Sequence, residues 1–132
     1  MITSAEEFVR LRLSESAEDY GRAGSEDAPA SVWLDVVARF PEMREWVAHN
    51  KTVPLDILES LARDEDARVR AGVAAKRKLS VALFERLSRD NDEAVRHQLA
   101  CNAKAPEHVM QHLSVDPVEL VRNAALKRLR KS

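Results

Sequence analysis

The sequence predicts an all-α protein: a short α-solenoid (superhelix) of 26-residue two-helix repeats with an N-terminal helical cap. A nine-residue pattern occurs three times at an interval of 26 residues, as ARDEDARVR from Ala62, SRDNDEAVR from Ser88 and SVDPVELVR from Ser114. Apolar residues recur in the same columns at spacings of three and four, which is typical of one helix face. No repeat alternates apolar and polar residues as a half-buried strand would. Repetition at this period indicates a stack of similar helical units.

Aligning the chain at this period gives four rows, which begin at Asp35, Leu61, Leu87 and Leu113. The last row stops halfway, so the chain holds about three and a half units. The apolar columns contain Met43, Val69, Val95 and Val121; Val47, Val73, Leu99 and Ala125; Ile57, Leu83 and Val109; Leu58, Phe84 and Met110; and Leu61, Leu87 and Leu113. We predict that these columns form the core.

Each row predicts two short helices. One kind runs over residues 54–63, 80–89 and 106–115, with proline opening two of the three. The other kind begins near Ala67, Glu93 and Val118, after acidic turns that supply N-cap residues. A helix of about ten residues is too short to persist alone in water, so each must bury its apolar face against its neighbours.

Residues 1–34 do not follow the period, and we predict that they form an N-terminal helical capping segment. Ser4 followed by Glu7 is a capping-box signature for a first helix. The stretch GRAGSEDAP, residues 21–29, predicts a break, after which helical spacing resumes with Trp33 as a core residue of the cap. Residues 35–132 are the helical repeats, and we expect both parts to form one compact domain.

The pattern Leu-x-x-Asp followed by Val-Arg resembles HEAT-like repeats, and the 26-residue period with proline before a helix is still more similar to the leucine-rich repeat variant. The resemblance covers residues 35–132 and concerns architecture, since such folds bind many unrelated partners. It implies a ladder of ion pairs between stacked rows, formed by Asp64, Asp90 and Asp116 with Arg70, Arg96 and Arg122. Alternatively, these arginines are a row of anion binders.

Charge is divided between the two kinds of turn. The turns within rows are acidic, and the turns between rows are basic; we call the latter the basic edge. Its bases are Lys51, Lys76, Arg77, Lys78, Lys104, Lys127, Arg128, Arg130 and Lys131. Acids at helix N-termini and bases at C-termini complement the helix dipole, which explains part of this division. The triple KRK exceeds that need, so the basic edge is also a candidate surface for a partner.

Trp46 is a further candidate for partner binding. Its equivalent positions hold Gly72, Gln98 and Ala124, so the repeat does not require a large ring there. We expect Trp46 to pack under the N-terminal cap; the alternative is an exposed aromatic anchor of the kind that dominates interface energies.

A metal site is the least favoured reading of the histidines. His97 and Cys101 are four residues apart, as are His108 and His112, which could in principle supply four zinc ligands. The equivalent positions in other rows are Ala71, Ala75, Ala82 and Arg86, so the repeat does not require them. Exposed helix histidines and a partly buried thiol are the simpler interpretation, and we predict no metal and no cofactor.

The sequence therefore predicts a non-catalytic protein that binds other proteins as a scaffold or adaptor. No glycine-rich phosphate loop and no nucleophile signature is present, so we do not expect an enzyme. Two alternatives stay open: a nucleic-acid-binding HEAT-like protein that uses the basic edge, and an inhibitor or antitoxin-like binding partner. No apolar run approaches the roughly 20 residues that span a bilayer, and the start lacks signal-peptide character, so we expect a cytoplasmic protein without membrane contact.

Overall fold

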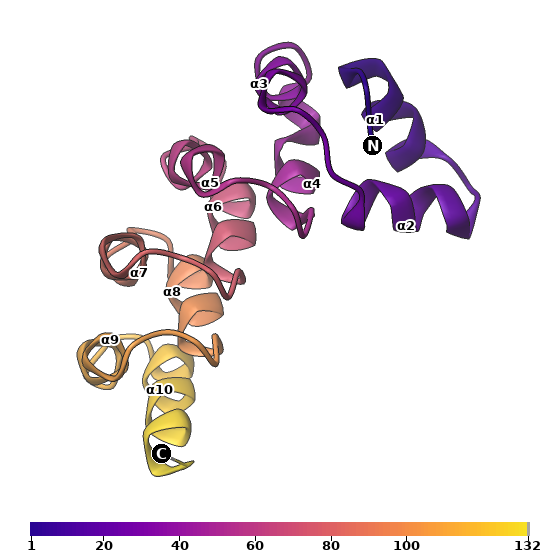
Figure 1. The fold of residues 1–132 in the computed structure, drawn as a ribbon. Coiled ribbons are helices and arrows are strands. Elements are labelled where there is room, and N and C mark those ends of the chain that lie inside the picture. The colour runs from indigo at the N-terminus through magenta and orange to yellow at the C-terminus, as the bar shows by residue number, and fades with distance from the viewer. Residues whose placement is uncertain (132) are drawn as a thin grey trace. The chain divides into compact units, whose positions relative to one another are not determined.

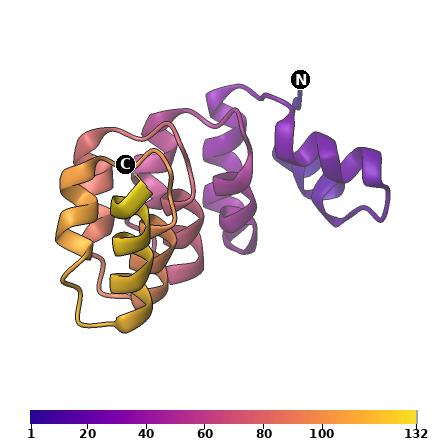
Figure 2. The same ribbon diagram turned by 90° about the horizontal axis from the view of Figure 1, so that it is seen from below.

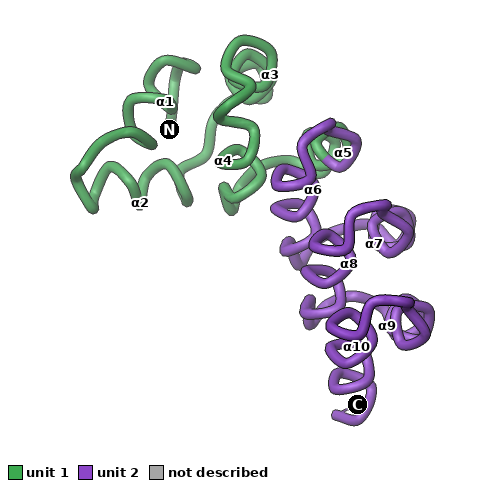
Figure 3. Tube along the Cα trace, turned by 180° about the vertical axis from the view of Figure 1, so that it is seen from behind, with its two compact units in different colours: residues 1–61 green, residues 62–132 purple. Residues whose placement is uncertain are grey.

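The computed structural model describes residues 1–131, in which ten α-helices and one 3-10 helix follow one another and no β-strand occurs. The prediction of an all-α fold is confirmed for these residues (Figure 1). The chain divides into two compact units, Met1–Leu61 and Ala62–Ser132 (Figure 3). No helix within residues 1–131 combines the length and the apolar character needed to cross a membrane.

Unit 1 contains the first five α-helices and the 3-10 helix η1. They are α1 (Ala5–Leu13), α2 (Ala17–Ser25), α3 (Ala30–Arg39), η1 (Pro41–Met43), α4 (Arg44–His49) and α5 (Leu55–Leu61). Helix α1 packs on α2 and α3, α3 packs on η1 and α4, and α4 contacts α2 and α5. Residue 34 lies inside α3, so the junction expected between residues 34 and 35 falls within a helix.

The core of unit 1 is built around two aromatic rings. Trp33 of α3 is 1% exposed and meets Phe8 of α1 edge-to-face, with 5.2 Å between the ring centroids. This geometry is favourable for aromatic pairs. The expectation that Trp33 belongs to the core of this segment is confirmed.

The Ser4 N-cap predicted at the start of the chain is confirmed, whereas the return bond of the capping box is shifted by one residue. The backbone N–H of Glu7 donates to the Ser4 hydroxyl over 3.0 Å, and the Glu7 carboxylate accepts from the N–H of Thr3 over 3.4 Å. The carboxylate thus reaches one residue beyond the cap itself.

The predicted break at residues 21–29 was wrong in its first half, because α2 continues through Gly21 and Gly24 to Ser25. Glycine costs about 1 kcal/mol in a helix interior relative to alanine, so the sequence favours a break there. Three contacts oppose that cost: Ser16 caps α2, Ala23 is buried, and Arg22 pairs with Glu26 over 2.6 Å.

The helical conformation of Gly21 can be tested by substitution, because a methyl group fits at this position without a clash. A Cβ built at Gly21 meets nothing within 4 Å. We expect Gly21→Ala to raise the free energy of unfolding by about 0.4–1 kcal/mol, because alanine loses less backbone entropy on folding. Urea melts of the two proteins measure the difference, and a destabilised variant would contradict the helical assignment of this position.

Unit 2 contains five helices in two layers. They are α6 (Ala67–Ala74), α7 (Val81–Ser88), α8 (Glu93–Ala100), α9 (Glu107–Leu113) and α10 (Glu119–Lys131). Helices α6, α8 and α10 follow one another in one layer, and α7 and α9 lie side by side in the other (Figures 1 and 2). Helix packing is therefore sequential, as expected of a repeat.

All five predicted apolar columns are buried. Within unit 2 the fully or nearly fully buried members are Val69, Val73, Leu83, Phe84, Leu87, Val95, Leu99, Val109, Met110, Leu113, Val121 and Ala125. The helix boundaries are slightly narrower than predicted, since Ser80 and Pro106 are N-cap residues rather than helical ones. Asp66 and Asp92 cap α6 and α8, because each carboxylate accepts a backbone N–H of the first turn.

Candidate interaction surfaces

The repeated arginine of one row binds the repeated aspartate of the next row within unit 2. Arg70 of α6 donates from Nε to Asp90 over 2.8 Å and from Nη2 to the other carboxylate oxygen over 3.2 Å. Its third nitrogen, Nη1, donates to the backbone carbonyl of Asp64 over 2.8 Å. This is the planar, bidentate geometry that favours arginine over lysine. We call such an inter-row pair a rung.

The second rung repeats the first. Arg96 Nε donates to Asp116 over 2.8 Å, Nη2 lies 3.4 Å from the other oxygen, and Nη1 donates to the carbonyl of Asp90 over 2.8 Å. The side chains are 14% and 6% exposed. Burial raises the pKa of the Asp116 carboxyl, but hydrogen bonds from Arg96 and from the Val118 N–H outweigh it and leave the pKa below its ordinary value. The pair is therefore ionised at neutral pH.

Each aspartate of the column also organises its own turn. Asp64, Asp90 and Asp116 accept the backbone N–H two residues later, over 2.9 Å in each case. Arg122 in the last row donates from Nη1 to the carbonyl of Asp116 over 3.0 Å, as its equivalents do to theirs. In Arg70 and Arg96 all three guanidinium nitrogens have partners, so the arrangement holds neighbouring rows together.

A buried asparagine that the sequence did not single out brings two turns of the basic edge together. Asn102 is 6% exposed and donates from Nδ2 to the carbonyls of Ala74 and Lys76, over 2.8 and 2.6 Å. Its side-chain oxygen accepts the N–H of Lys104 over 2.9 Å. Arg77, Lys78 and Lys104 are exposed in these adjoining turns, and Lys76 is half-buried. Arg128 of α10 adds a further cation by donating to the carbonyls of Asn102 and Ala105.

Unit 1 contains a matching asparagine. Asn50 is fully buried and donates to the carbonyls of Ala23 and Glu26, over 2.8 and 3.0 Å. The N–H of Lys51, the member of the basic edge in this unit, donates to the carbonyl of Gly24 over 2.9 Å. Asn50, Lys76, Asn102 and Arg128 share one column of the 26-residue alignment. Two asparagines in one column of the alignment are the sequence signal that could have revealed these buried turn contacts.

Trp46 packs against the first two helices of unit 1 and stays half-exposed. The Arg12 guanidinium lies 3.5 Å from the Trp46 ring centroid and 4.6 Å from that of Tyr20. A cation over an aromatic face at this distance is attractive. These three side chains, with Ala23, Gly24 and His49, line a small cavity of about 220 Å³. Trp46 thus contacts the N-terminal segment, but through the half-buried Arg12 guanidinium rather than through the core.

The histidines and the cysteine do not gather at one point. The Cys101 sulfur lies 3.8 Å from His97 Nε2, and His108 Nε2 lies 3.1 Å from Glu85, both at exposed positions. His112 is exposed. Within residues 1–131, no three His, Cys, Asp or Glu side chains are placed to hold a metal ion.

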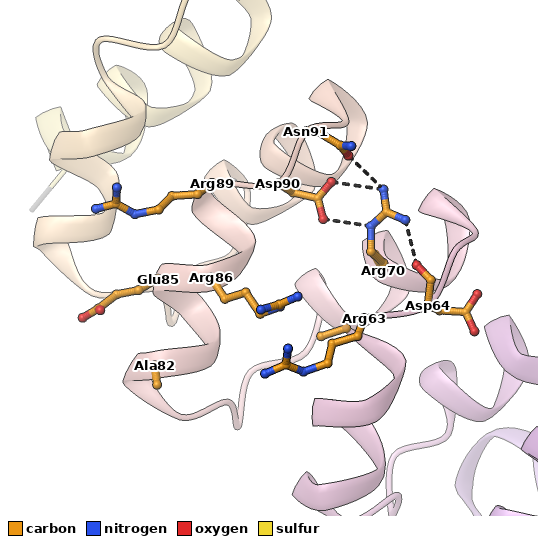
Figure 4. A pocket seen from close by; sticks show the side chains of 10 residues that line it. Arg63, Asp64, Arg70, Ala82, Glu85, Arg86, Arg89, Asp90 and Asn91 are labelled. Atoms are coloured by element: carbon orange, nitrogen blue, oxygen red, sulfur yellow. Dashed lines mark hydrogen bonds and ion pairs between the residues drawn. The ribbon is translucent and has the colours of Figure 1, made fainter.

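A cleft in unit 2 is lined by several arginines (Figure 4). We call it the arginine cleft; its volume is about 660 Å³, and its lining residues are Ala62, Arg63, Asp64, Arg70, Ala82, Glu85, Arg86, Arg89, Asp90 and Asn91. Arg63, in the turn before α6, and Arg86, on α7, extend into the same space, whereas Arg89 points away from it. Sequence reasoning did not select this site, because exposed arginines on separate elements carry no sequence signature.

Comparison with known protein families, curated proteins and solved structures gives no match to this chain. The class of the protein therefore rests on its structure: within the described residues it is an all-α protein whose helices pack in sequence within each unit.

Proposed function

We propose that this chain is an α-solenoid of about three and a half repeats, capped by residues 1–34, that binds another protein without catalysing a reaction. The single observation that supports this most is the arrangement of charge in unit 2. Two bidentate rungs and the Asn102 contacts tie the rows together, while arginines and lysines on the outer surface stay accessible. A rigid surface with fixed charges loses little conformational entropy on binding, and its charges select the partner.

Affinity capture from lysate tests this proposal. The full chain is immobilised at low and at moderate salt, with and without nuclease, and bound proteins and nucleic acids are both identified. We expect a discrete protein that survives nuclease treatment and binds the purified chain directly. Recovery of nucleic acid alone, lost on nuclease treatment, would contradict the proposal.

Nucleic-acid binding is the second candidate, and the adjoining turns of the basic edge favour it. Asn102 holds the turn of Lys76, Arg77 and Lys78 beside the turn of Lys104. Phosphate contacts release counterions, so an affinity that depends on them falls steeply with salt. Fluorescence anisotropy with a labelled oligonucleotide measures how the affinity depends on salt. The native chain is compared with a variant in which Lys76, Arg77 and Lys78 are changed to Glu. A salt-insensitive or unchanged affinity excludes this use of the edge.

A further inference from the structure

Three arginines of the cleft lining, Arg63, Arg86 and Arg89, have no ion-pair partner among the described residues. Arg63 and Arg86 are both exposed and extend into the same space (Figure 4). Arg89 points away from that space (Figure 4), and the remaining charged groups of the lining have partners of their own. Arg70 and Asp90 form a rung, and Glu85 binds His108 over 3.1 Å. Arg63 and Arg86 are therefore the groups through which the cleft can bind a ligand.

Two like charges that face one space repel each other, and an anion between them removes that repulsion. A guanidinium presents its N–H groups as a planar fork that matches a carboxylate or a phosphate. Two forks from separate elements, the turn before α6 and helix α7, can contact one oxyanion from two sides. The chemistry of the cleft is thus that of an oxyanion receptor.

We propose that Arg63 and Arg86 bind a carboxylate side chain of an acidic segment in a partner protein. This inference rests on the proposed function and names the chemistry of the partner. Bound there, a glutamate or aspartate of the segment accepts hydrogen bonds from both guanidinium groups, while the rest of the segment lies along the cleft.

The acids around the cleft favour a peptide over a nucleic acid. Asp64 and Asp90 belong to its lining, and Glu65, Asp66 and Asp92 follow in the same two turns. A phosphate backbone carries a charge on every nucleotide and would meet these carboxylates. A peptide can place one carboxylate between the arginines and neutral or basic residues beside the acids, which is the charge complementarity that protein interfaces use.

NMR titration of the full isotope-labelled chain tests the assignment. The probe is a short blocked peptide of alternating glutamate and glycine, and its control replaces glutamate with glutamine. We expect the glutamate peptide to shift the Nε–H signals of Arg63 and Arg86, and the glutamine peptide to leave them unchanged. Arg63→Gln and Arg86→Gln should each weaken binding about tenfold, the effect of losing one charge-assisted hydrogen-bonded contact.

Arg130→Gln is the control, because Arg130 is exposed on α10 and does not belong to the lining of the cleft. It removes the same charge, and we expect it to leave peptide affinity unchanged. Circular dichroism melts of all three variants should match the native chain, since each residue is exposed. Arg63→Lys keeps the charge without the fork and should still weaken binding.

Several results would overturn the assignment: no shift at millimolar glutamate peptide, equal weakening by Arg130→Gln, or an oligonucleotide that shifts the signals of Arg63 and Arg86 when the peptide does not. Failure of the cleft is distinguishable from failure of the proposed function. A captured partner protein that binds the Arg63→Gln/Arg86→Gln double variant as tightly as it binds the native chain would exclude the cleft as the binding site. That result would leave the proposal of protein binding intact.

Discussion

Replacing Leu87 by alanine should lower the free energy of unfolding by roughly 2–5 kcal/mol, the range measured for leucine deletions in packed cores. Leu87 ends the apolar face of α7, is fully buried, and shares its column with Leu113. Its removal loses the transfer free energy of the side chain and leaves a cavity that the neighbouring helices only partly fill. Urea melts measure the change as a shift of midpoint at constant slope.

Val81→Ala is the matched control for Leu87→Ala. Val81 lies on the same helix but is 54% exposed, so we expect a change within about 0.5 kcal/mol. If Leu87→Ala leaves the midpoint unchanged, or if both variants lose the same stability, the register of the 26-residue repeat is wrong.

Replacing Asn102 by alanine should cost on the order of 2–3 kcal/mol, because three hydrogen bonds of a buried amide disappear together. The carbonyls of Ala74 and Lys76 and the N–H of Lys104 lose their side-chain partner. An unsatisfied buried polar group costs its full desolvation penalty, which makes this loss larger than that of an exposed contact.

Asn123→Ala is the comparison for Asn102→Ala, since Asn123 is exposed on α10 and we expect a change within about 0.5 kcal/mol. Hydrogen exchange adds a local readout: amides of the turns at residues 74–78 and 102–105 should exchange faster in the Asn102 variant. Unaltered stability and exchange would show that these turns do not depend on the asparagine.

The helices and the core could be predicted because one physical requirement repeats in every row. A short helix must bury its apolar face, so Val69, Val95 and Val121 recur at a fixed interval and are buried. The N-cap residues Asp66 and Asp92 were predictable for the same reason, since a helix start needs an acceptor for its first N–H groups.

Features that depend on only a few rows, or on side-chain direction, were not predicted. Helix α2 forms despite its two glycines because an N-cap, a buried alanine and an ion pair stabilise it. None of these contacts follows from the 26-residue period. Asn102 replaces apolar packing with hydrogen bonds in one turn. The convergence of Arg63 and Arg86 depends on where two exposed side chains point, and exposed positions are not constrained by the repeat.

The rungs offer the most direct test that the sequence repeat is a stack of helical rows. A double-mutant cycle with Arg96→Met and Asp116→Asn measures the coupling between the two side chains, and the exposed pair Arg68–Asp66, 77% and 41% accessible, is the comparison. We predict a coupling of about 1–3 kcal/mol for the rung and less than about 1 kcal/mol for the exposed pair.

The coupling energy between Arg96 and Asp116 should depend on pH, and the shifted pKa of Asp116 fixes the direction of that dependence. The Asp116 pKa is lowered in the folded chain, so its contribution is present above the ordinary aspartate value of about 3.9 and is lost as the pH falls through the folded pKa. We predict full coupling at neutral pH and its disappearance in acid. Additive single substitutions at neutral pH would contradict the stacked arrangement of rows on which this account is built.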